Sequence, residues 1–141
     1  MSAAAPGFGS RSAARRRALE VLYQADLLEQ PIATVLAREL SDPLRRPDAY
    51  TVELVTGVER RHEELDSRIR AAAERWALER MPLVDRNLLR LGAFELLERV
   101  EVPTAVVLDE AIELAKLLST DDSGRFVNGV LGRIAREVRG G

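Results

Sequence analysis

Apolar residues in this chain recur at intervals of three and four, and prolines separate the segments in which they do so. This spacing places apolar side chains on one face of an α-helix, and no segment keeps the alternation typical of a strand. Proline interrupts a helical hydrogen-bond ladder and is tolerated between helices. The dividing prolines are Pro31, Pro43, Pro47, Pro82 and Pro103. The pattern therefore predicts an all-α bundle.

About seven helices are expected, joined by short links. They cover residues 12–29, 32–41, 48–61, 63–79, 83–100, 104–118 and 122–138. The stretch from 48 to 79 is too long for one typical helix, so we place a break near ERRHEE. Helix 83–100 is apolar nearly all the way round, which indicates a central position in the fold.

The length of 141 residues fits one domain with a core of ordinary size. We expect a flexible lead-in over residues 1–10 and a single domain over 11–138. The chain has no cysteine, which excludes disulfides and thiolate metal sites. No apolar run is long enough to span a membrane, and the first ten residues lack the features of a signal peptide. These observations predict a soluble, cytoplasmic protein.

Motifs for catalysis are missing from the sequence. The single histidine, His62, lies among charged residues and is typical of a solvated surface position. No phosphate-binding loop, dinucleotide fingerprint or nucleophile elbow occurs. Thr120, Asp121 or Asp122 precedes an apolar helix and is better placed to cap it than to bind a metal. We therefore expect no enzyme, no metal and no cofactor.

Four arginines open the first helix although the chain carries a net charge of −2. Three interpretations are open: the arginines form a solvated helix end, bind a partner protein, or bind phosphates. Arg11 and Arg15 share an edge of the apolar face, where cations oppose the helix dipole by roughly 0.3–1 kcal/mol each. Phosphate is a natural ligand to offset that cost. Arg16 lies four residues before Glu20 and fits a solvated ion pair.

A second candidate lies in STDDSGRFVNGVLGR, residues 119–133. On this helix Phe126 falls beside the core stripe, in the first turn, between Arg125 and Arg133. An aromatic ring flanked by cations is typical of a platform on which a base stacks. Packing of Phe126 against a neighbouring helix fits the pattern equally well.

Four motifs, in this order, resemble the NusB family of transcription antitermination proteins. They are RRRALEVLYQADL, VDRNLLRLGAFELL, VVLDEAIELAK and STDDSGRFVNGVL, and the resemblance covers residues 11–138. It implies two packed three-helix groups with an arginine-rich first helix. It further implies binding of BoxA RNA from ribosomal RNA leaders together with NusE, a small-subunit ribosomal protein. The pair would join an antitermination complex on RNA polymerase and support ribosomal RNA maturation.

The resemblance and the charge pattern together predict which residues bind RNA. Phosphates position the strand, whereas unpaired bases are read by stacking and by hydrogen bonds to their edges. Tyr23 and Phe126 are the expected stacking residues, and Asp122 and Asn128 the expected edge readers. The full set of expected RNA-binding residues is Arg11, Arg15, Arg16, Tyr23, Asp122, Arg125, Phe126 and Asn128. Ser12 and Ala13 interrupt the basic run of the family, which predicts a weaker or shifted footprint.

The partner surface is expected around helix 83–100, with Asp85 and Arg90 as NusE contacts. Arg90 fits a structural ion pair equally well. A different function is a self-associating helical scaffold, such as a homodimer, in which the RNA surface is covered. A methyltransferase-linked domain of similar pattern is disfavoured by the chain length.

Overall fold

A computed structural model describes residues 8–140, with the backbone alone described for residues 8–10. Within this range the chain forms seven α-helices and one 3-10 turn, and no strand occurs. The elements are α1 (Phe8–Leu28), α2 (Ile32–Leu40), α3 (Ala49–Arg60), α4 (His62–Ala72), η1 (Leu78–Arg80), α5 (Leu83–Glu98), α6 (Thr104–Leu118) and α7 (Asp121–Arg139). The all-α prediction is confirmed. Of the expected lead-in, residues 1–7 lie outside the described residues and residues 8–10 belong to α1.

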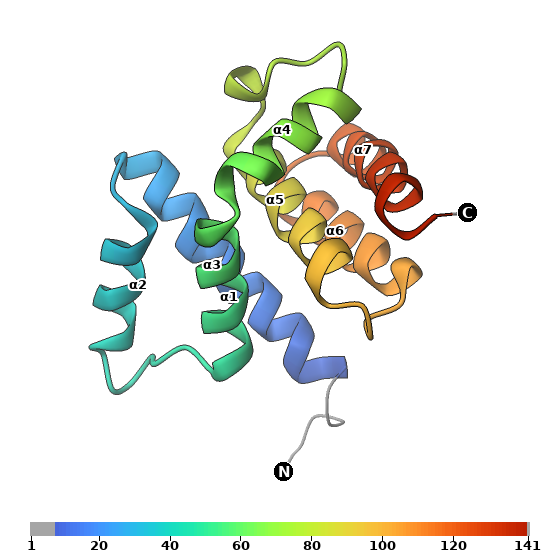
Figure 1. Cartoon of the computed structure of the whole chain (residues 1–141). Helices are drawn as coiled ribbons and strands as arrows, with labels where there is room; N and C mark the ends of the chain where they lie inside the picture. Colours follow the sequence, from blue (N-terminus) through green and yellow to red (C-terminus); the bar gives the residue numbers. More distant parts are fainter. Residues whose placement is uncertain (1–7, 141) are drawn as a thin grey trace.

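The helices pack as two groups of three (Figure 1). α1, α2 and α3 contact one another, and so do α5, α6 and α7. α5 also packs on α1 and α3, and it thereby joins the two groups. α4 lies across the top of Figure 1 and contacts both α5 and α7. None of the helices described from residue 8 onward has the length and hydropathy that a bilayer crossing needs.

The central position predicted for α5 is confirmed. Every residue from Asn87 to Leu96 is buried, on all sides of the helix. α3 approaches α5 so closely that a Cβ atom at Gly57 would lie 2.2 Å from the ring of Phe94. Glycine at this position therefore permits the close contact between α3 of one helical group and α5 of the other.

The predicted helix over 63–79 is too long. α4 begins at His62 and ends at Ala72, where the chain turns before η1. Continuing α4 as a helix would carry Leu78 and Met81 away from the core, whereas the turn buries both side chains. The burial of these two residues outweighs the local helical pattern, and the turn leaves Trp76 near the surface.

Candidate nucleic-acid interface

Arg15 belongs to the core of the fold. Its side chain is 5% exposed, and its Nε donates to both carboxylate oxygens of Glu95 at 2.9 and 3.0 Å. Its Nη1 donates to Glu110 at 3.1 Å. Burial alone would lower the pKa of Arg15, but the hydrogen bond and charge of Glu95 outweigh it and raise the pKa. The expected phosphate contact at Arg15 is therefore corrected, because two glutamates rather than phosphate offset its position at the helix start.

Arg11 lies one turn away and is partly exposed. Its guanidinium stacks 4.4 Å above the ring centre of Tyr50, and its Nη1 lies 3.6 Å from Glu101. Tyr50 donates to Glu95 at 2.5 Å. The pKa of Tyr50 is raised, mainly by burial and next by this hydrogen bond. Arg11 keeps part of its charged surface in solvent, so it can still meet a phosphate.

The next two arginines of α1 differ from each other. Arg16 is exposed, and its Nε lies 3.8 Å from Glu20, which agrees with the expected solvated ion pair. Arg17 donates to Glu39 at 2.6 Å and to the carbonyl of Arg45 at 2.6 Å. Arg17 therefore fastens α1 to α2 and to the loop that follows it.

The junction between α6 and α7 is fixed by a short chain of hydrogen bonds. Thr120 caps α7 by accepting from the Ser123 amide at 3.0 Å, which confirms Thr120 as the cap. Ser123 donates from its hydroxyl to Asp85 Oδ2 at 2.8 Å and so ties α7 to the first turn of α5. The other oxygen, Asp85 Oδ1, is buried without a partner among the described residues, a state that costs roughly 1–3 kcal/mol.

A cleft of about 520 Å³ opens beside this junction. We call it the Trp76 cleft. Its lining residues are Trp76, Arg80, Met81, Pro82, Asp85, Thr120, Asp122, Ser123 and Phe126. Phe126 is half-buried, and its ring centre lies 6.1 Å from that of Trp76 at an interplanar angle of 71°. Trp76 was missed from the sequence because it fell inside a predicted helix.

The remaining expected residues of α7 are exposed around the same junction. Arg125 and Asn128 line a hollow between α6 and α7 together with Lys116. Asp122 lines the Trp76 cleft and pairs with Arg125 one turn further along α7. Their exposure leaves these side chains accessible to a ligand.

An apolar groove of about 450 Å³ runs along α1 on the other side of the α5 start. We call it the α1 groove. Its lining residues are Arg16, Leu19, Glu20, Tyr23, Gln24, Leu27, Val84 and Leu118. Tyr23, Leu27 and Leu118 are exposed, although side chains of this kind normally favour the interior.

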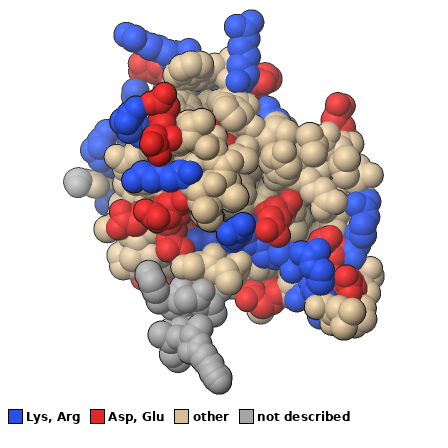
Figure 2. All heavy atoms as spheres, turned by 180° about the vertical axis from the view of Figure 1, so that it is seen from behind, with Lys and Arg blue, Asp and Glu red and all other residues tan. Residues whose placement is uncertain are grey.

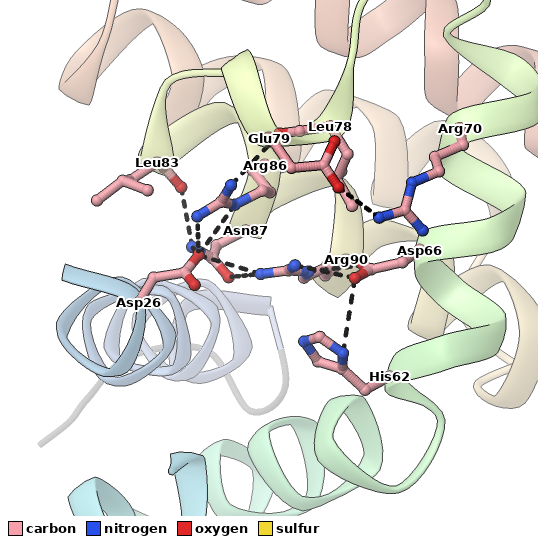
Figure 3. Close-up of polar contacts among 10 residues, drawn as sticks. All are labelled: Asp26, His62, Asp66, Arg70, Leu78, Glu79, Leu83, Arg86, Asn87 and Arg90. Atoms are coloured by element: carbon pink, nitrogen blue, oxygen red, sulfur yellow. Dashed lines mark hydrogen bonds and ion pairs between the residues drawn. The ribbon is translucent and has the colours of Figure 1, made fainter. Parts of the chain in front are cut away.

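Arg90 lies at the centre of a buried ion-pair network (Figure 3). Its Nε and Nη2 donate to the two oxygens of Asp66 at 2.8 and 3.0 Å, and its Nη1 donates to Asp26 at 3.1 Å. Arg86 and Asn87 also donate to Asp26, at 3.1 and 2.9 Å. The network links α1, α4 and α5, so the structural interpretation of Arg90 is the correct one.

Two titratable groups in this network differ in their environment. Burial would raise the pKa of Asp26, but the hydrogen bond from Asn87 and the charge of Arg90 lower it below its usual value. His62 lies at the edge, with its Nδ1 3.6 Å from Asp66.

The expected partner contacts are both corrected, because Arg90 is 6% and Asp85 3% exposed and neither offers a free surface to a docking protein.

On the face shown in Figure 2, charges of both signs are mixed rather than gathered by sign. Figure 2 shows basic side chains beside acidic ones, with broad uncharged areas between them. Most arginines of the described range form ion pairs with glutamate or aspartate, such as Arg60 with Glu98 at 2.9 Å. A nucleic acid would therefore meet local contacts on this protein rather than a continuous basic field.

The comparisons with known proteins decide the family. The NusB family model matches residues 12–136. This chain belongs to the NusB family. NusB of Saccharopolyspora erythraea, named a transcription antitermination protein, is 54% identical over 129 residues, which cover 90% of this chain and 87% of that protein. The corresponding protein of Salinispora arenicola is 49% identical and covers 89% of this chain and 95% of its own.

Solved NusB structures share the fold. NusB from T. maritima has a TM-score of 0.81 and 35% identity, covering 90% of this chain and 91% of its own. A complex of the antitermination factors NusB and NusE with double-stranded RNA matches with a TM-score of 0.79 and 30% identity, covering 92% and 98%. The two three-helix groups implied by the resemblance are therefore those of NusB.

Proposed function

We propose that this protein is a transcription antitermination factor of the cytoplasm that binds BoxA RNA of ribosomal RNA leaders together with NusE. Its relatives carry antitermination in their names, and a solved neighbour unites NusB, NusE and RNA. The observation that carries the proposal is the start of α5, which we call the corner, where Asp85 lines the Trp76 cleft and the preceding residue, Val84, lines the α1 groove. The complex would act on RNA polymerase and support ribosomal RNA maturation.

The RNA side of the proposal uses the exposed residues around this corner. Arg16 lines the α1 groove and Arg125 the hollow on α7, and each would meet a phosphate. Phe126 in the Trp76 cleft and Tyr23 in the α1 groove are the proposed stacking residues. Asn128 is exposed one turn from Arg125 and would bond to a base edge.

Two more of the expected residues keep a part in this proposal. Arg11, near the start of α1, would add a further phosphate contact. Asp122 would accept from a base edge once Arg125 turns from it to a phosphate.

The part of the α1 groove lined by Leu27, Val84 and Leu118 supplies the proposed surface for NusE, beside the Arg16 and Tyr23 that are assigned to RNA. Leu27 and Leu118 expose apolar side chains beside Val84, and contiguous exposed apolar surface marks protein interaction sites. NusE is the proposed occupant because a solved neighbour of this fold contains NusE. A second copy of this chain would cover the same groove in the scaffold alternative.

An RNA titration with and without NusE tests the proposal. BoxA RNA and a scrambled RNA of equal length are each added to the protein alone and to its mixture with NusE. We expect tighter binding of BoxA than of the scramble, with the larger difference in the presence of NusE. Leu118→Glu should weaken NusE binding without unfolding the protein. If neither mixture distinguishes the two RNAs and the protein sediments as a dimer, the scaffold function replaces this one.

A further inference from the structure

We propose that the Trp76 cleft holds one unpaired RNA base, with Trp76 as a stacking wall and Asp85 selecting bases that carry an amino group. This inference rests on the proposed RNA-binding function and assigns it a base-reading site. The cleft combines the aromatic rings, the unpaired acceptor and the cation that such a site requires.

Two aromatic rings form the walls. Trp76 is 59% exposed, a large fraction for a ring of this size. Its edge-to-face contact with Phe126 forms a corner rather than a closed stack, because the ring planes meet at 71°. A planar base can stack on one ring while its edge meets the other. The volume of about 520 Å³ leaves space between η1 and the start of α7 for such a ligand.

Asp85 supplies a polar floor. Its Oδ2 is satisfied by Ser123 at 2.8 Å, whereas its Oδ1 is buried without a partner among the described residues, so a base donor reaches it only when the atoms that cover it move aside. An ionised carboxylate only accepts hydrogen bonds, so the missing partner must be a donor. The amino groups of cytosine, adenine and guanine are donors of this kind, whereas uracil keeps only its ring N3–H as a donor and presents a carbonyl oxygen in place of the amino group of cytosine. The floor therefore favours cytosine over uracil.

Arg80 gives the cleft a cation at its rim. Its side chain is exposed and forms no ion pair with the acids in the described part of the chain. The acid beside it, Glu79, is instead bound by Arg70 at 2.7 Å. Arg80 is thus available to the phosphate of the nucleotide whose base enters the cleft.

The experiment uses the fluorescence of Trp76, the single tryptophan of the full chain. Oligocytidylate and oligouridylate of equal length are titrated, with binding followed in parallel by the anisotropy of a labelled RNA. We expect tryptophan quenching that saturates with binding and is stronger for oligocytidylate. Trp76→Ala should weaken binding about 5- to 150-fold, whereas Trp76→Phe should retain most of the affinity.

Variants of the floor test selectivity separately from folding. Asp85→Asn replaces an acceptor with a group that can also donate, so the preference for oligocytidylate over oligouridylate should disappear or reverse. Ser123→Ala removes the hydrogen bond from Ser123 to Asp85 but keeps the carboxylate, so the preference for oligocytidylate should persist in this variant. Circular dichroism melting verifies that each variant is folded, and the Trp76 variants decide the proposal if Asp85→Asn does not fold.

The outcomes separate this inference from the function on which it rests. If neither oligonucleotide, BoxA RNA nor scrambled RNA binds, the proposed RNA-binding function fails. If RNA binds but Trp76 is not quenched and Trp76→Ala keeps full affinity, the site is overturned while the function stands. Quenching with unchanged selectivity in folded Asp85→Asn overturns the role of Asp85.

Discussion

The guanidinium of Arg15 and the carboxylate of Glu95 are joined by two hydrogen bonds across 80 residues of sequence, at 2.9 and 3.0 Å. Both side chains are buried, and Tyr50 and Glu110 complete their contacts. The pair fastens α1 of the first helical group to α5 at the centre of the second. A residue selected from the sequence as an RNA contact is thereby a link between the two halves of the fold.

We expect Arg15→Ala to lower the free energy of unfolding by about 3–5 kcal/mol, because it leaves the Glu95 charge buried without its partner. Arg16→Ala, one residue away and exposed, should change it by less than about 0.5 kcal/mol. Urea denaturation of both variants measures the difference. A loss below about 1 kcal/mol for Arg15→Ala would contradict a structural role.

The Asp26 network predicts a pH dependence of stability. The pKa of Asp26 in the folded state lies below its ordinary value of 3.8, so the ionised form stabilises the fold. This contribution is fully present above about pH 5 and is lost as the pH falls through 3.8 and then through the lower folded pKa. Asp26→Asn should thus be less stable than the parent at neutral pH, and the gap should narrow in acid. An unchanged gap between neutral pH and pH 2.5 would rule out the contribution.

The charge of Arg16 should appear in the salt dependence of RNA binding. Loss of one phosphate contact on single-stranded RNA should reduce the slope of log affinity against log salt by about 0.7. Arg16→Ala is expected to show this change with BoxA and scrambled RNA alike, because phosphate contacts carry no sequence information. Arg60→Ala serves as the control, since Arg60 is exposed and paired with Glu98 on α5, away from the corner. Equal slopes for parent and Arg16→Ala would remove Arg16 from the interface.

Two glycines in different surroundings should respond to alanine substitution with opposite changes in stability. Gly57→Ala should destabilise by roughly 1–3 kcal/mol, because the new methyl group would meet the Phe94 ring at 2.2 Å. Gly129→Ala should stabilise by about 0.5–1 kcal/mol, because it lies on the exposed face of α7 with no atom within 4 Å of the new Cβ. Thermal melting compares the two, and a neutral Gly57→Ala would show that the helices can separate at little cost.

The sequence was informative wherever a local pattern determines the outcome. Proline positions and apolar spacing located the helices, and the all-round apolar character of 83–100 located the centre. The end of α4 at Ala72 was missed because it depends on the burial of Leu78 and Met81 by distant helices.

The role of side chains at the candidate site was harder to predict. A helical wheel places Arg15 at the edge of the apolar face, but it does not show that Glu95 occupies that edge. Asp85 was likewise interpreted as a surface acid, because nothing in its own helix indicates the hydroxyl of Ser123. Trp76 gave a usable signal, since it is the single tryptophan of the chain and lies in a segment rich in charged residues, but its assignment to a helix obscured it.

Val84 and Asp85 are consecutive residues, and they face two different binding surfaces. Val84 lines the α1 groove proposed for NusE, while Asp85 lines the cleft proposed for a base. Any ligand that immobilises this turn of α5 reduces the ordering that the second ligand must still impose. Binding free energies are reciprocal, so if NusE tightens RNA binding by some factor, RNA must tighten NusE binding by the same factor. One peptide unit in the first turn of α5 would thus couple the two proposed associations.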